Sequence, residues 1–342
     1  MGCNWTPPPG WDREDALALH RLLHEPPDFE RPREWACAAT AWLVSSASSS
    51  VLRALRAAKA GSVVRVMDYG AGTGLASLQL LRVWDRSGLT QECADKGVTL
   101  ELHLVDLANS WFCLAHELLS PRERVFIHAV RVPPGPFVPL PDLFPTQHFD
   151  VIVANMVLHL IRPVSLRILA DEISQVLKPS GQFYWTAPDI GPARAGSILF
   201  HDVNRMVRQL WEAKLDCGLT RGERLRLRGQ VTPVTLESRS RAAKRVLPIA
   251  TELTALRAAM ASKLDVRATR SLNKIGAADL RETLLVPANA AELLSECQDV
   301  RDSTQFAAAL FLEALHRILP EQDVGAPVLI DWAYGSARLG TQ

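Results

Sequence analysis

Short apolar runs alternate with amphipathic stretches through the middle of the chain. Runs of four to eight apolar residues are typical of buried strands, and apolar positions three and four residues apart indicate helices. The predicted strands are 63–68, 98–105, 124–130, 149–154 and 182–187, and the predicted helices are 75–84, 108–119 and 163–177. Strands that alternate with helices form βαβ units, so this pattern predicts a parallel sheet in a protein of the α/β class.

The segments before and after the predicted sheet have different patterns of apolar residues. Before the sheet, apolar spacing predicts helices over 12–24 and 32–60, and the serine-rich stretch 45–50 can interrupt the second. After the sheet, helices are predicted over 197–215 and 303–318, and a strand over 328–334. The stretches 245–251 and 284–290 resemble each other, through either duplication or chance. We therefore expect a helical N-terminal cap (1–61), an α/β core (62–190) and a mixed helical and α/β region (191–342) that completes the sheet.

Composition narrows the class of protein. The 342 residues are 48% hydrophobic and 22% charged, which is typical of a globular protein. The formal net charge of +1 is too small to attract nucleic acid or anionic lipid to the protein as a whole. The six cysteines form no CxxC pair, as expected for reduced thiols in a cytoplasmic protein. No apolar run is long enough to cross a membrane. We expect no membrane or nucleic-acid partner and no metal, while the oligomeric state stays open, a homodimer included.

The first residues match a short acylation pattern. Met1-Gly2-Cys3 begins a sequence that fits N-myristoylation of Gly2, with Cys3 available for a second acyl chain. An ordinary unmodified N-terminus is the alternative, and the pattern is short enough to arise by chance.

A glycine-rich turn follows the first predicted strand. Gly70, Gly72 and Gly74 allow a tight turn and a close approach of the backbone to a ligand, with Ala71 between the first two. The helix that follows the turn directs its free N–H groups toward the same ligand. Asp68 precedes the turn, and its carboxylate would attract a cationic group and repel a pyrophosphate.

The spacing of the turn differs from that of dinucleotide sites. Nicotinamide and flavin enzymes carry the pattern G-x-G-x-x-G. Counted from Gly70, the third glycine position is Leu75, and counted from Gly72 it is Ser77. The sequence therefore disfavours a nicotinamide enzyme.

The turn, the acid Asp106 at the end of the next predicted strand and the strands that follow in order resemble the class I (Rossmann-like) S-adenosylmethionine (SAM)-dependent methyltransferases of the small-molecule, natural-product type. The resemblance covers about residues 62–190. It implies a Rossmann-like methyltransferase sheet, SAM as cofactor and S-adenosylhomocysteine (SAH) as product. It also implies that Asp68 binds the ammonium group of SAM, that Asp106 binds the ribose hydroxyls and that Leu107 packs on adenine. Gly74 and Asp106 lie further apart than the usual twenty or so residues, and a polar insertion over 87–96 absorbs the excess.

The rest of the cofactor site is less well marked. The third predicted strand ends without the acid that relatives often place near the adenine amino group. His128, the backbone around Ala129 or the Pro-rich segment that follows would then hold adenine. By the same resemblance, Asn155 and Met156 would lie beside the methionine part of SAM.

Two histidines are candidate catalytic bases. His159 stands where many small-molecule relatives carry a histidine, and an imidazole is suited to accept a hydroxyl proton near neutral pH. The alternative is a histidine that only packs at a helix start. His201 lies in the segment that often covers the substrate in this family, or else is an exposed helical histidine. Asp189 either faces the substrate or caps a helix.

The expected reaction is methyl transfer to a hydroxyl, carbon or amine of a small molecule of secondary metabolism. The proline-containing signature of nucleic-acid amino-group methyltransferases is absent, since Met156-Val157 stands in place of its prolines. Two alternatives stay open. One is a SAM-binding protein of this fold that catalyses a cyclisation or rearrangement, and the other is a macromolecular methyltransferase.

Overall fold

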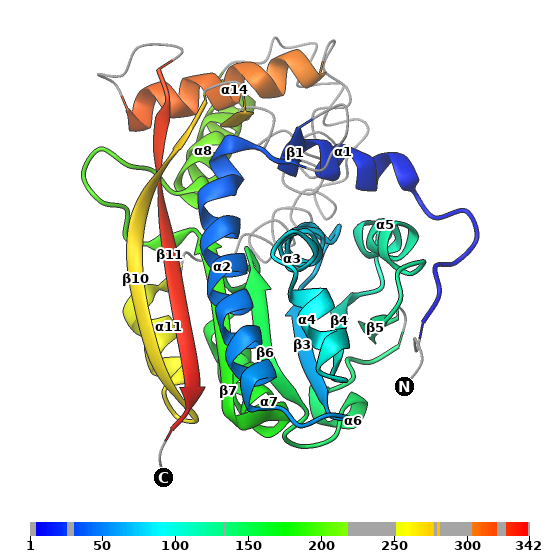
Figure 1. Ribbon diagram of the computed structural model, residues 1–342. Helices are drawn as coiled ribbons and strands as arrows, with labels where there is room; N and C mark the ends of the chain where they lie inside the picture. Colours follow the sequence, from blue (N-terminus) through cyan, green and yellow to red (C-terminus); the bar gives the residue numbers. More distant parts are fainter. Residues whose placement is uncertain are drawn as a thin grey trace. The chain divides into compact units, whose positions relative to one another are not determined.

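A seven-stranded sheet is the central element of the computed structural model of this chain (Figure 1). The structure describes residues 5–25, 31–132, 135–217, 251–276, 279–280, 303–319 and 326–340. The strands of the sheet are β3 (Val63–Tyr69), β4 (Thr99–Leu107), β5 (Val125–Arg131), β6 (Phe149–Asn155), β7 (Leu177–Pro188), β10 (Leu264–Ile275) and β11 (Val328–Leu339). Their order is β10-β11-β7-β6-β3-β4-β5. This order confirms the predicted α/β class.

The direction of the strands locates the ligand-binding edge. Parallel pairing joins β3 to β4 and to β6, β4 to β5, and β6 to β7, whereas β11 runs antiparallel to β7. The chain passes from β3 outward through β4 and β5 and then returns to the other side of β3 as β6. Open α/β sheets bind ligands beyond the carboxyl ends of their strands, at such a reversal of strand order. The ends of β3, β4 and β6 therefore define the expected site.

Helices cover the sheet. The helix α2 (Glu34–Ala57) packs on β3, β6 and β7 and against α3 (Leu75–Arg86), and Figure 1 shows it in front of the strands. The helix α7 (Pro163–Val176) packs on β7, and α11 (Leu253–Met260) packs on α7. The buried face of α3 includes Leu75, Leu80 and Trp84. Their spacing of five and four residues places them on one side of the helix, the side that packs on the core.

The N-terminal segment covers a neighbouring helix. The helix α1 (Arg13–Leu23) packs against α5 (Ser110–Leu119). Arg13 and Glu117 form an ion pair of 2.8 Å between these helices. The ring of Trp5 stacks on Phe112 with a centroid separation of 5.4 Å. A two-stranded antiparallel ladder of β1 (His24–Glu25) and β2 (Arg31–Pro32) separates α1 from α2.

Two details of the first helices depend on polar side chains. The serine-rich stretch 45–50 does not interrupt the second predicted helix, because α2 is continuous. The hydroxyl of Ser49 donates to the carbonyl of Ser45 at 2.9 Å, and Ser48 accepts from the indole N–H of Trp84 at 3.2 Å. A serine hydroxyl that donates to the carbonyl four residues earlier is compatible with a continuous helix, and the bond from Trp84 gives Ser48 a partner on α3. The predicted insertion contains the short helix α4 (Leu89–Asp95).

The chain divides into two compact units. The first comprises Met1–Pro188, Glu252–Ser271 and Trp332–Gln342, and the second comprises Asp189–Thr251 and Leu272–Asp331. In the second unit, α8 (Phe200–Cys217) packs against α14 (Ser303–Ile318). The guanidinium of Arg194 binds the buried carboxylate of Asp331 through two nitrogens. Of the similar stretches 245–251 and 284–290, all residues except Thr251 lie outside the described part of the chain.

Candidate functional site

Asp68 lies at the carboxyl end of β3 and is only 1% exposed. Its Oδ2 accepts two hydrogen bonds from Ser77 in the first turns of α3, from the N–H at 3.1 Å and from the hydroxyl at 2.7 Å. Its Oδ1 is buried and has no hydrogen-bond partner among the described residues. Burial raises the pKa of Asp68 to about 6, against the opposing effect of these hydrogen bonds. One oxygen is thus held by the fold, and the other is available to a cationic group.

The glycine turn is compact on one side and open on the other. Gly70, Gly72 and Gly74 all adopt positive φ, at 69°, 55° and 86°. A Cβ on Gly70 would overlap the side chain of Val157, so only glycine fits there. A Cβ on Gly72 would meet no described atom within 4 Å. The turn therefore offers free space for a ligand at Gly72, while Ala71 next to it is buried.

Asp106 ends β4 and faces the same turn. Its Oδ2 accepts from the N–H of Gly72 at 2.7 Å, and its Oδ1 accepts from the N–H of Leu107 at 2.6 Å. A carboxylate has about four acceptor sites, so two remain for a vicinal diol. Burial raises the pKa of Asp106 to about 6. The side chain of Leu107 is 42% exposed, which is unusual for a leucine at the end of a buried strand and fits an apolar ligand surface.

His128 is placed differently from its predicted role. Its ring is 3% exposed, shares a hydrogen bond of 3.1 Å with the ring of His103 and lies edge-on to Phe144. Burial lowers its pKa to about 4, so the ring is neutral. The His128 ring is occupied inside the fold, and we do not retain it as an adenine contact. Ala129 is 4% exposed, which leaves only its backbone for such a contact.

Asn155 is the last residue of β6, and Met156 follows it. The amide of Asn155 donates to the hydroxyl of Thr40 at 3.2 Å and accepts from the hydroxyl of Thr186 at 2.7 Å. Met156 adopts a φ of 56°, a conformation that costs energy for any residue with a Cβ. Its N–H donates to the carbonyl of Thr186 at 2.9 Å. Backbone strain of this kind is concentrated at functional sites, and here it occurs at the expected ligand edge.

His159 lies just beyond this strained turn, in the short 3₁₀ helix η1 (Leu158–Leu160). Its Nδ1 is buried and has no hydrogen-bond partner among the described residues. Burial lowers the pKa of His159 to about 4, so the imidazole is neutral at pH 7. A neutral ring with one unengaged nitrogen can accept or donate a hydrogen bond when a ligand reaches it.

The second unit holds the other two candidates. The Oδ1 of Asp189 accepts from the N–H of His201 at 3.1 Å, which places Asp189 at the N-terminus of α8 as a cap. Burial raises the pKa of Asp189 to about 7. The ring of His201 is half-buried, and burial lowers its pKa. The catalytic role expected of His201 stays a prediction.

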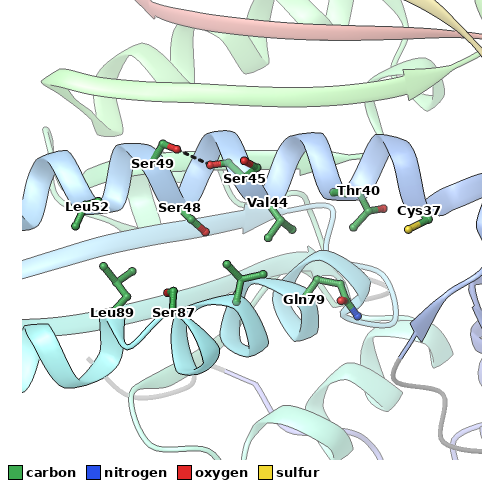
Figure 2. Close-up of a pocket in the computed structure, with 12 residues that line it drawn as sticks. Cys37, Thr40, Val44, Ser45, Ser48, Ser49, Leu52, Gln79, Ser87 and Leu89 are labelled. Carbon is green, nitrogen blue, oxygen red and sulfur yellow. Dashed lines mark hydrogen bonds between the residues drawn. The ribbon is translucent and has the colours of Figure 1, made fainter.

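A groove between α2 and α3 was not predicted from the sequence. Figure 2 shows Thr40, Val44 and Ser48 of α2 opposite Gln79 of α3 across this groove, which has a volume of about 380 Å³. Thr40 both lines the groove and holds Asn155. The two residues are far apart in sequence, and no local pattern signals their contact.

Two other findings concern metals and membranes. Within the described residues, no three His, Cys, Asp or Glu side chains are grouped so that they could hold a metal ion. In the same part of the chain, every helix is too short or too polar to cross a membrane.

Comparisons with known proteins agree with this geometry. A family profile described as "Methyltransferase domain" matches residues 30–222, more than half of the chain. A tRNA N(3)-cytidine methyltransferase METTL2 from Gallus gallus is 29% identical over 117 residues, which are 34% of this chain and 28% of that protein. The chain thus matches less than a third of the length of this relative.

One solved structure shows the same fold at low identity, and a second is less similar. A loganic acid methyltransferase with SAH is 11% identical, with a TM-score of 0.55 over 90% of this chain and 96% of that one. A phosphoethanolamine N-methyltransferase 2 from Haemonchus contortus, in complex with S-adenosyl-L-methionine, is 15% identical, with a TM-score of 0.40 over 86% and 52% of the two chains. The family profile, with the strand order and the glycine turn described above, shows that the chain belongs to the methyltransferase domain family and has the Rossmann-like fold of class I SAM-dependent methyltransferases.

Proposed function

We propose that this methyltransferase acts on a hydroxyl, carbon or amine of a small molecule and that His159 takes part in the transfer. The observation that carries the proposal is the buried Nδ1 of His159, which has no partner in the part of the chain that the structure describes and lies just after the strained turn at Met156. A buried polar atom without a partner costs stability, so its presence at a ligand edge is better explained by a ligand than by packing. The modest net charge of +1 also favours a small acceptor over a polyanion.

The residues of the first unit fit SAM. The unpartnered Oδ1 of Asp68 would accept the ammonium group, and the remaining acceptor sites of Asp106 would bind the ribose hydroxyls. The open side of Gly72 would leave room for the cofactor, and Leu107 would contact adenine. When bound, SAM supplies an electrophilic methyl group on a sulfonium.

The protein itself contributes position and proton transfer. The bonds from Asn155 to Thr40 and Thr186 fix the end of β6, next to the reaction centre that we propose. Such fixing favours an in-line approach of the acceptor. His159 accepts a proton or a hydrogen bond from the acceptor, since its ring is neutral at pH 7. Its low pKa makes it a weak base, so orientation of the acceptor is the larger part of its role.

The test separates catalysis from cofactor binding. SAM affinity is measured by calorimetry, and SAH formation is measured with a panel of small hydroxyl, amine and carbon acceptors. His159→Ala should reduce turnover about 100-fold and leave SAM affinity unchanged. His316→Ala, at an exposed position of α14, is the control. Unchanged turnover in His159→Ala would remove His159 from the mechanism.

A macromolecular acceptor is the second candidate. It is favoured by the partial similarity to the tRNA methyltransferase. Transfer of labelled methyl groups from SAM to total tRNA, compared with transfer to a small-molecule extract, distinguishes the two acceptors. If the protein binds SAM and converts an acceptor without releasing SAH, the activity is a rearrangement and both candidates fail.

A further inference from the structure

The three most exposed large apolar side chains in the described part of the chain lie in one short segment. Leu160 is 59% exposed, Val164 is 67% exposed and Ile168 is 57% exposed. Val164 and Ile168 are four positions apart on α7, a spacing that places them on one face of the helix, and Leu160 lies four positions before Val164. Exposed apolar side chains are common singly, but a group of this kind indicates a contact surface.

The core of the protein does not use this face of α7. The buried positions of the helix include Leu166, Leu169 and Ile173, and the helix packs on β7 and on α11. The exposed residues Val164 and Ile168 belong to neither contact. Their exposure is therefore additional to what the fold requires, since the buried side of α7 already supplies its packing.

The charge beside this face is positive. Arg162 and Arg167 are exposed in the same segment, and no Asp or Glu occurs between Asp150 and Asp171. Asp171 pairs with Lys263 of the neighbouring chain segment at 3.3 Å. The net charge of the whole chain, +1, thus hides a local excess of positive charge. Exposed aliphatic side chains with arginines beside them are the combination by which peripheral helices bind anionic bilayers.

The size of the face favours a lipid surface over a second protein. Three side chains that are each a little over half exposed present at most a few hundred Å² of apolar surface. A stable contact between two proteins buries about 800 Å² on each partner. A lipid surface requires less, because aliphatic side chains insert one by one between the acyl chains while arginines contact the headgroups.

We propose that Leu160, Val164 and Ile168 form an insertion face by which this protein attaches reversibly to anionic lipid surfaces, with Arg162 and Arg167 at the level of the headgroup phosphates. The expectation of no membrane partner rested on the missing spanning run and on the net charge of the whole chain. Neither observation excludes attachment at the surface, which needs no helix that crosses the bilayer.

The position of the insertion face has a consequence for the reaction. Leu160 directly follows His159 in η1, so attachment brings the proposed reaction edge close to the lipid. An acceptor dissolved in the bilayer could then reach this edge without crossing water. This consequence rests on the proposed function, whereas the attachment itself does not depend on the identity of the acceptor.

The experiment measures co-sedimentation of the chain, carrying no acyl group, with lipid vesicles. One set of vesicles is phosphatidylcholine alone, and the other contains equal parts of phosphatidylcholine and phosphatidylglycerol. The native protein should bind the mixed vesicles more tightly than the neutral ones. Binding should weaken at high salt, because salt screens the attraction between arginines and headgroups.

Variants of the insertion face test its two components. Val164→Gln combined with Ile168→Gln should weaken binding to the mixed vesicles about tenfold or more, through loss of inserted apolar area. Arg167→Gln should weaken it about fivefold, the effect of one basic residue at an anionic surface. Arg167→Lys keeps the charge and should bind like the native protein.

Matched variants elsewhere on the surface are the controls. Val83→Gln combined with Leu312→Gln replaces two exposed aliphatic residues of α3 and α14, and Arg122→Gln replaces an exposed arginine after α5. These changes should leave vesicle binding unchanged. Thermal unfolding shows whether each variant is folded. Because no SAM or acceptor is present, vesicle binding can fail or succeed independently of the proposed function.

Three results would overturn the proposal. The first is a native protein that does not sediment with the mixed vesicles. The second is equal binding by the native protein and the Val164→Gln, Ile168→Gln variant. The third comes from sedimentation velocity: a native dimer that this double variant dissociates would assign the face to a second copy of the chain. Equal binding to neutral and mixed vesicles would contradict the part given to Arg162 and Arg167.

Discussion

The carboxylate of Asp68 is attached to Ser77 by two hydrogen bonds that end on the same oxygen, Oδ2. One bond comes from the backbone of α3 and the other from the hydroxyl, so the carboxylate can neither rotate nor withdraw without breaking both. The second oxygen, Oδ1, is thereby held at a fixed position in the buried end of β3. The fold accepts the cost of a buried and incompletely paired carboxylate, which a cationic ligand would offset.

Replacement of Asp68 by Asn tests this arrangement. Asp68→Asn should weaken SAM binding about tenfold to 100-fold, because a hydrogen bond to a charged group contributes about 1.5–3 kcal/mol. The free protein should not lose stability at pH 7.5, since the buried charge is removed. Calorimetry with SAM and thermal unfolding measure the two effects. Ser77→Ala keeps the charge and the backbone hydrogen bond and removes only the bond from the hydroxyl, so its loss of SAM affinity should be smaller.

Binding of SAM should depend on pH. Burial raises the pKa of Asp68 and of Asp106 to about 6. The ammonium group requires ionised Asp68, so SAM affinity should fall as the pH drops below about 6, by at most about tenfold per pH unit for one proton. Titrations at pH 5, 6 and 7.5 in buffers of different ionisation enthalpy measure both the affinity and the released protons. Constant affinity from pH 7.5 to 5 would contradict the assignment of Asp68.

Acid should destabilise the fold through a buried histidine cluster. His103, His128 and His148 are each less than 9% exposed, and burial lowers the pKa of His128 and His148 to about 4 and that of His103 further. Their unfolded-state pKa is about 6.5. Between pH 6.5 and 4 the unfolded chain binds more protons at these sites, so their contribution to stability is complete above pH 6.5 and falls as the pH falls.

Two buried carboxylates oppose this effect of the histidines on stability. The raised pKa values of Asp68 and Asp106 make the folded state bind more protons than the unfolded chain between about pH 4 and 6.

A variant at one histidine isolates its contribution to the pH dependence of stability. His148 lies against the rings of Phe144 and Phe149, so His148→Phe removes one titrating group and keeps an aromatic ring. Urea unfolding at pH 7.5, 5.5 and 4.5 should show a shallower loss of stability in His148→Phe. An identical pH profile would exclude His148 as a contributor.

Gly335 should be intolerant of any side chain. It pairs with Trp185 across β7 and β11, and a Cβ built on it would overlap the indole ring. Gly335→Ala should lower the free energy of unfolding by about 3 kcal/mol, as overpacking of a rigid core does. Ser336→Ala, the next position on β11, should change it by less than about 0.5 kcal/mol. Urea unfolding measures both.

A second substitution tests the cause of that effect. Trp185→Phe makes room beside β11, so Gly335→Ala should cost less in its presence than in the native background. Equal costs in both backgrounds would show that the clash with Trp185 is not the source of the destabilisation.

The sequence predicted those elements that local patterns encode. The strands that became β3, β4, β5 and β6 are short, largely apolar runs, and Asp68 and Asp106 lie near the carboxyl ends of the first two. A parallel sheet brings such strand ends to one edge, so the proximity of these two carboxylates could be predicted from the chain order, whereas their roles toward SAM come from the family resemblance and stay predictions. The predicted proximity of the glycine turn to Asp106 is realised as the hydrogen bond from Gly72.

The features that were missed depend on contacts between distant segments. The strand β10 and the helix α11 were not predicted, because only some positions of β10 alternate in burial and its apolar pattern is sparse. His128 was expected at the cofactor edge, but its ring pairs with His103 on the neighbouring strand. The contact between Thr40 and Asn155 joins α2 to β6, and the sequence pattern around neither residue predicts it.

The antiparallel strand β11 has a consequence for synthesis of the chain. From Trp332 onward it belongs to the first unit, yet this part is translated after the second unit, Asp189–Thr251 and Leu272–Asp331. During translation, the edge of β7 that pairs with Trp332–Ala337 has no partner from β11 until the ribosome has passed these residues. An exposed strand edge is prone to pair with other chains. The edge of β7 therefore stays unpaired by β11 for as long as the ribosome needs to translate the second unit. Slower elongation through that unit should increase aggregation of the nascent chain and leave the native state unchanged.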